Sequence, residues 1–149
     1  MRWWILALLF VARVGNGFQF QTMASTGDSL SAAFGLDNAT IGLLIGVFMA
    51  PGLFLAMPAG ILGRFTPDRV LASAGLAAMA LGAMVSATAT GPVVVALGRL
   101  LSGAGFLLVS VYLTKMVADW FEGREIATAM SIFVASLPFG IAMGQIGQT

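Results

Sequence analysis

Residues 39–62 read ATIGLLIGVFMAPGLFLAMPAGIL and contain no charged side chain. A helix needs about 20 consecutive apolar residues to cross the hydrocarbon core of a lipid bilayer. This stretch is long enough, and a soluble protein would have to hide nearly all of it from water. It therefore predicts a transmembrane helix.

Similar apolar runs lie on both sides of this stretch. The Trp3-Trp4 pair opens the first of them, as expected for tryptophans at a membrane–water boundary, and Gly91-Pro92 predicts a tight turn between two others. We expect an all-α, polytopic membrane bundle of about five transmembrane helices, with the other four at residues 3–24, 70–90, 93–118 and 126–146.

The composition excludes most soluble classes of protein. Hydrophobic residues make up 59% of the 149 residues and charged residues only 9%, with a mean hydropathy of +0.99, whereas soluble domains carry about 25% charge. Cysteine and histidine are absent, which excludes a zinc site of the usual type. No basic run is present to bind nucleic acid, and no paired carboxylates lie within a span to act as acid and base. We therefore expect that the protein is not an enzyme and that it binds neither a metal nor a cofactor.

The charges between the predicted helices are distributed unevenly. On one side the loops contain no Lys or Arg, and their charged residues are Asp28 and Asp37. On the other side the loops hold five basic residues, Arg2, Arg64, Arg69, Lys115 and Arg124. Because basic residues remain on the cytoplasmic side, we expect a multi-pass protein of the plasma or inner membrane with a cytoplasmic N-terminus. A cleaved signal peptide within residues 1–25 is an alternative, although Arg13 interrupts its apolar core.

Helix packing is suggested by small residues and prolines. Gly42 and Gly46 form a Gly-x-x-x-Gly pattern, which is typical of close helix contacts in membranes. Pro51, Pro58 and Pro138 each remove a backbone donor and predict kinks in their helices. Both features are also common in any membrane bundle.

The segment after the second predicted helix resembles a known family motif. Residues 60–69 read GILGRFTPDR, which is similar to the Gly-x-Leu-Ala-Asp-Arg-x-Gly-Arg-Lys loop between the second and third helices of the major facilitator superfamily. Gly60, Leu62 and Arg69 match that motif, whereas Arg64 stands where the family has Asp and Asp68 where it has Arg. The resemblance implies a latch between transporter halves with its charges reversed; a short turn with solvated charges is the alternative.

Two further segments resemble the same family. Residues 99–105, RLLSGAG, are similar to its Arg-x-x-x-Gly-x-Gly signature in the fourth helix, and the loop with Asp119 and Arg124 is similar to its connection into the fifth helix. The resemblance implies that residues 1–149 form the N-terminal half-bundle of a transporter. It also implies a missing C-terminal half or a partner membrane chain, and we expect a truncated chain. The sequence style is closest to branches that carry small anions such as cyanate or nitrate.

Two arginines fall within predicted spans. Arg13 lies about 15 Å along its helix, near the bilayer midplane, and Arg99 lies about 10 Å along its own. A charge at the bilayer centre costs at least about 2.5 kcal/mol on insertion scales, so it must face protein, water or a ligand. No Asp or Glu lies well inside any span to neutralise them.

Polar and aromatic residues share a helix face with each arginine. The helical period of 100° per residue predicts two cavity-facing stripes, one with Arg13, Asn16, Phe20 and, at its edge, Gln21, and another with Arg99, Ser102 and Phe106. We hypothesise that the arginines bind a small anion, with Asn16, Gln21 and Ser102 as hydrogen-bond donors. The alternative is that each arginine is structural and bonds backbone carbonyls at a helix break.

These observations predict a segment of a secondary transporter that moves a small solute, in this case an anion, by alternating access. Its partners would be the lipid bilayer and the solute. A small structural or regulatory membrane subunit without transport activity of its own is the other reading of so short a chain.

Overall fold

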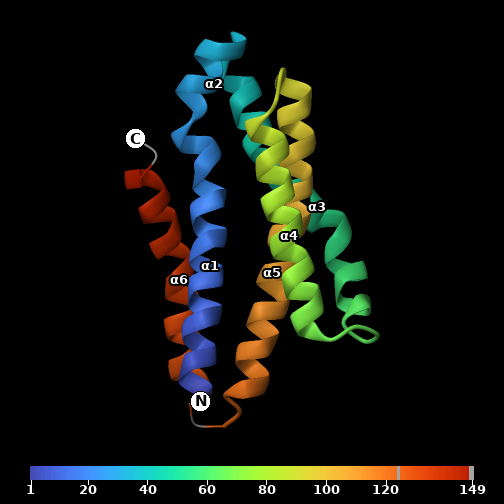
Figure 1. Cartoon of the computed structure of the whole chain (residues 1–149), viewed down its shortest axis with the longest axis vertical. Coiled ribbons are helices and arrows are strands. Elements are labelled where there is room, and N and C mark those ends of the chain that lie inside the picture. Colours follow the sequence, from blue (N-terminus) through green and yellow to red (C-terminus); the bar gives the residue numbers. More distant parts are fainter. Residues whose placement is uncertain (124, 148–149) are drawn as a thin grey trace. The chain divides into compact units, whose positions relative to one another are not determined.

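The computed structural model describes residues 1–123 and 125–147, and the regular structure in this part of the chain is entirely helical (Figure 1). The helices are α1 (Arg2–Ser25), α2 (Gly27–Phe34), α3 (Asn38–Leu62), α4 (Asp68–Ala87), α5 (Pro92–Trp120) and α6 (Ile126–Gly147). All except α2 are long and apolar enough to cross a membrane. The predicted all-α bundle with five spans is confirmed.

The short helix α2 was not expected from the sequence, which indicates only a polar connection at residues 25–38. Its first turn contains Asp28, whose negative charge favours a helix N-terminus. Gly35 ends the helix with a φ of 63°, a left-handed conformation that glycine adopts without a steric penalty. The hydroxyl of Ser31 donates to the carbonyl of Leu36 and secures the same turn. The eight residues of α2 are too few to span a bilayer.

The spans begin close to their predicted positions because local signals define those ends. Asp37 caps α3: its Oδ1 accepts hydrogen bonds from the hydroxyl of Thr40 and from the backbone N–H of Thr40, the latter at 3.1 Å. These bonds, led by that from the hydroxyl, hold the pKa of Asp37 below its usual value. Pro92 is the first residue of α5, where its missing N–H has no cost. The end of α5 was predicted two residues early, since the helix includes Asp119 and Trp120.

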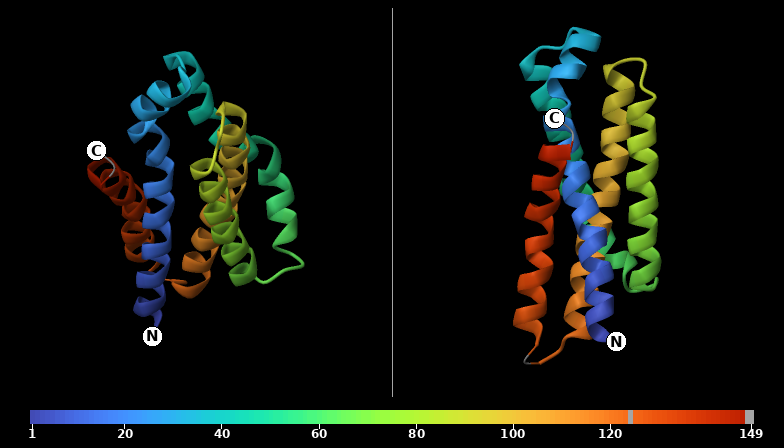
Figure 2. Two further views of the ribbon diagram at one scale, coloured as in Figure 1. Left: turned by 45° about the horizontal axis from the view of Figure 1, so that its top comes forward. Right: turned by 60° about the vertical axis from the view of Figure 1, so that its left-hand side comes forward.

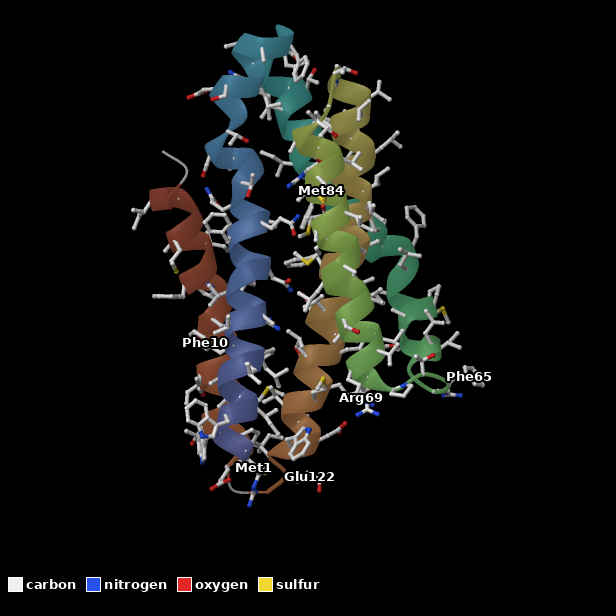
Figure 3. The ribbon with its side chains drawn as sticks, in the orientation of Figure 1. Met1, Phe10, Phe65, Arg69, Met84 and Glu122 are labelled. Atoms are coloured by element: carbon white, nitrogen blue, oxygen red, sulfur yellow. The ribbon has the colours of Figure 1, made fainter. Side chains whose placement is uncertain are left out.

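The chain forms two compact units, and each is described by itself. The first unit, residues 1–25 and 110–149, contains α1, α6 and the last part of α5. In it α1 and α6 lie side by side along their length (Figure 2). The ring of Trp3 meets that of Phe121 edge to face at 5.3 Å, and Met1 and Glu122 lie at the same end of the unit (Figure 3).

The second unit, residues 26–109, contains α2, α3, α4 and the first part of α5. Glycines bring α4 and α5 together: a Cβ on Gly75 would lie 2.9 Å from the carbonyl oxygen of Gly105, and one on Gly98 would lie 2.6 Å from that of Gly82. Such backbone contact is how membrane helices gain packing energy without a hydrophobic driving force. Phe65 lies in the turn between α3 and α4, and Arg69 is the second residue of α4 (Figure 3).

The Gly-x-x-x-Gly pattern of α3 does not make the predicted contact within the described residues. A Cβ on Gly42 or Gly46 would meet no described atom within 4 Å. The close approaches instead use glycines of α1, α4, α5 and α6. Pro51, Pro58 and Pro138 lie inside continuous helices, and the kinks remain a prediction.

Candidate functional site

Arg13 occupies the middle of α1 in the first unit. One guanidinium nitrogen, Nη1, donates to the hydroxyl oxygen of Thr114 at 3.2 Å, and that hydroxyl donates in turn to the carbonyl of Ser110 at 2.6 Å. The guanidinium carbon lies 4.4 Å from the centre of the Phe133 ring of α6. The Nε atom is buried and has no hydrogen-bond partner among the described residues. Arg13 therefore retains a buried N–H donor that no described residue uses.

Asn16 lies one turn after Arg13 and is fully buried. Neither its amide nitrogen nor its amide oxygen has a hydrogen-bond partner in the described part of the chain. Leaving such a group unsatisfied costs about 1–3 kcal/mol. A buried amide of this kind points to a bound solute or water in the working protein.

The other candidates of α1 lie further along the helix. Gln21 packs toward α6, because a Cβ on Gly144 would lie 3.0 Å from the Cβ of Gln21. Phe20 is half-buried. Their part in a solute cavity remains a prediction.

Arg99 is the corresponding residue of the second unit, and its side chain is almost completely buried. Its guanidinium carbon lies 4.4 Å from the centre of the Phe48 ring of α3, and Phe106 meets the same ring edge to face at 5.3 Å. Its Nε and Nη2 atoms have no hydrogen-bond partner among the described residues. Phe106, which the sequence placed on the same helix face as Arg99, thus contacts Phe48, and Phe48 in turn contacts the guanidinium of Arg99.

Ser102 faces α4. Its hydroxyl donates to the carbonyl of Met79 at 3.4 Å. A Cβ on Gly82 of α4 would lie 2.6 Å from the backbone nitrogen of Ser102, so the two helices are in close contact here. The observed bond of this hydroxyl serves helix packing.

Phe48 and Phe133 were missed by sequence reasoning. Neither is polar, and each is one of 11 phenylalanines in the chain. The only local signal is their depth, since both lie well inside a span, as the arginines do. An arginine without an acidic partner needs an electron-rich surface, and an aromatic face provides one.

The loop residues lie away from these clusters. Arg64 and Arg69 are exposed in and after the α3–α4 turn, close to Gly60 and Leu62, and Asp68 is the first residue of α4. Asp119 forms an exposed ion pair with Lys115 at 3.8 Å, and Arg2 forms another with Glu125 at 3.6 Å. Arg124 lies outside the described residues. The exposed pairs contribute little stability.

A hollow of about 400 Å³ lies on the first unit, and Arg13 is not among the residues that line it. It is lined by apolar and aromatic side chains of α1 and α6, namely Trp3, Leu6, Ala7, Phe10, Val11 and Ile132. It lacks the convergent polar groups that orient a solute. We therefore place one candidate site at Arg13 in the first unit and another at Arg99 in the second, and none in this hollow.

Comparison with known families decides the class of protein. A family model described as the Major Facilitator Superfamily matches residues 3–147. The chain belongs to this superfamily. No curated protein sequence matches the chain significantly. The resemblance inferred from residues 60–69 and 99–105 is therefore confirmed at the level of the superfamily.

Membership of the major facilitator superfamily makes the chain a multi-pass membrane protein of the secondary-transporter kind. The superfamily is generally not enzymatic. The structural or regulatory subunit considered above is not favoured by this result. Within a transporter superfamily, arginines that lie inside spans and have buried, unused donor atoms are candidates for solute contacts.

Proposed function

We propose that this major facilitator chain takes part in the transport of a small anionic solute, with Arg13 as its main contact. The observation that supports this most is the buried Nε of Arg13, which has no described hydrogen-bond partner although it lies in the middle of α1. No Asp or Glu lies well inside any span to neutralise the charge, since Asp68 and Asp119 stand at the ends of α4 and α5. An anion would supply both the missing charge and the missing acceptor.

Asn16 and Arg99 extend the proposal. The buried amide of Asn16 offers both a donor and an acceptor, and Arg99 offers two unpartnered N–H groups. Transport would follow from alternating access, in which one helical bundle rocks against a counterpart. We propose that the counterpart is a further bundle, supplied by additional residues or by a partner chain.

The role of Arg13 in anion binding can be tested by titration calorimetry, which measures the affinity of the purified chain for nitrate, cyanate and formate. Because a hydrogen bond to a charged group contributes about 1.5–3 kcal/mol, we expect Arg13→Ala to weaken binding about 10- to 100-fold. Arg13→Lys should recover only part of the affinity, since an ammonium lacks the planar, directed N–H groups of a guanidinium. The matched control is Arg2→Ala, an exposed arginine at the start of the same helix. Equal affinities in Arg13→Ala and Arg2→Ala would contradict the proposal.

We further propose that the N-terminus lies on the cytoplasmic side of a plasma or inner membrane. The proposal rests on the basic residues around the α3–α4 turn and the start of α1, against the acidic residues Asp28 and Asp37 around α2. Since the chain has no cysteine, single cysteines can be introduced without background. A membrane-impermeant maleimide applied to intact cells should label Ser29→Cys and spare Glu122→Cys. The reverse labelling pattern would refute this orientation.

A further inference from the structure

The two arginines lie in the same local sequence pattern. Residues 13–20 read RVGNGFQF and residues 99–106 read RLLSGAGF. In both, the arginine is followed at the third position by a small polar residue, at the fourth by glycine and at the seventh by phenylalanine. Both polar residues, Asn16 and Ser102, are buried. The likeness extends over two helical turns and lies in two different units of the chain.

The contacts around the two patterns are also the same. In each unit the guanidinium carbon lies 4.4 Å from the centre of a phenylalanine ring on a neighbouring helix, Phe133 for Arg13 and Phe48 for Arg99. In each, the glycine at the fourth position touches the backbone of that neighbouring helix. A Cβ on Gly17 would overlap the carbonyl of Leu137, and one on Gly103 would overlap that of Phe48. The glycine allows the close approach that brings the ring onto the guanidinium.

This arrangement leaves the guanidinium a defined set of free atoms. The guanidinium carbon lies over the phenylalanine ring, which attracts the charge without neutralising it. Of the edge atoms of Arg13, Nη1 donates to Thr114 and Nε is unpartnered. In Arg99, Nε and Nη2 are both unpartnered among the described residues. These atoms lie in the plane of the guanidinium, so a ligand must approach along that plane.

The charge and the geometry together select a class of ligand. Each arginine carries one positive charge. The other charged residues of α1 and α5, namely Arg2, Lys115 and Asp119, are exposed and form ion pairs of their own. A ligand with a single negative charge leaves the pair neutral, whereas a dianion would bury an uncompensated charge. Two coplanar oxygens match the fork of a guanidinium edge. A planar monoanion, such as a carboxylate or nitrate, meets both conditions.

We propose that the arginine-on-phenylalanine arrangement is an anion-binding element that occurs twice in this chain, with Phe133 and Phe48 as positioning residues and a planar monoanion as the ligand. The proposal rests on the proposed anion function and adds the ligand class and the role of the rings. Each ring holds its guanidinium in position, as a carboxylate would in an ion pair, but leaves the positive charge unneutralised. A carboxylate in the same place would compete with the ligand.

The test measures the affinities of formate, nitrate and sulfate for the purified full chain by titration calorimetry. We expect Phe133→Leu and Phe48→Leu to weaken formate and nitrate binding about 2- to 30-fold, the range of a cation–π contact. The matched controls are Phe139→Leu on α6 and Phe54→Leu on α3, two exposed phenylalanines that should leave affinity unchanged. Sulfate should bind at least 10-fold more weakly than nitrate.

A second series removes the risk that a leucine variant misfolds. Fluorinated phenylalanines at position 133 keep the shape of the ring while they weaken its attraction for a cation. Affinity for formate and nitrate should fall with each added fluorine, and no change across the series would overturn the role of the ring. Sulfate binding as tight as nitrate binding would overturn the ligand class. If the chain binds none of these anions, or binds them equally after Arg13→Ala, the proposed function itself fails.

Discussion

Gly17→Ala is expected to destabilise the packing of α1 against α6 by about 1–3 kcal/mol, the usual cost of forcing extra atoms into a packed contact. A Cβ at this position would lie 2.9 Å from the backbone nitrogen of Ile141 and closer still to the carbonyl oxygen of Leu137. Backbone atoms cannot turn aside as a flexible side chain does, so the two helices must separate. Gly140 makes the reciprocal contact with the carbonyl of Val14.

The control lies two residues earlier on the same helix. Gly15 is exposed, and a Cβ there would meet no described atom within 4 Å. Gly15→Ala should keep or slightly raise stability, because alanine is favoured over glycine in a helix by about 1 kcal/mol. The unfolding free energy of both variants can be measured by titrating the detergent-solubilised chain with SDS. Equal stability of the two variants would show that α1 and α6 do not meet at Gly17.

Asn16→Leu is expected to act in the opposite direction and to raise stability by about 1–3 kcal/mol. The side chain is fully buried, and both of its amide atoms are without a described partner. Leucine has nearly the same size and removes the cost of that unsatisfied group. Anion affinity should fall in the same variant, since the amide is a proposed donor. A gain in stability combined with a loss of binding is expected where a residue is retained for function.

The control for Asn16 is a buried polar residue that is already satisfied. The hydroxyl of Ser136 donates to the carbonyl of Phe133 within α6, and the residue is as deeply buried as Asn16. Ser136→Ala should therefore bring no gain in the same SDS titration. If Asn16→Leu lowers stability instead, the amide is satisfied in the folded protein and its proposed role as a free donor is wrong.

The spans were predictable from the sequence because the bilayer sets a single length requirement. A run such as residues 39–62 satisfies it without any knowledge of neighbouring helices. The short helix α2 was not predictable in this way, since eight partly polar residues carry no comparable signal. Gly42 and Gly46 show the limit of local patterns: they match a contact motif, yet the described contacts are made by other glycines. Which glycine meets a backbone depends on how the helices pack.

The candidate site was predictable only in part for a similar reason. Arg13 and Arg99 stand out in the sequence because a charge inside a span is costly. Phe48 and Phe133 do not stand out, since an apolar side chain is expected at nearly every position of such helices. Their role depends on contacts across 51 and 120 positions of the chain, counted from residue 99 to 48 and from residue 13 to 133. Only the folded units bring these residues together.

A guanidinium that is held by a phenyl ring instead of a carboxylate keeps its full positive charge, and that gives Arg13 an electrical consequence. A charge that crosses the whole membrane field gains or loses about 2.3 kcal/mol per 100 mV. Arg13 lies near the middle of its span, so any rocking step that shifts it along the membrane normal becomes sensitive to voltage. Binding of a monoanion would cancel that sensitivity, and the empty and loaded forms would respond differently to the same membrane potential.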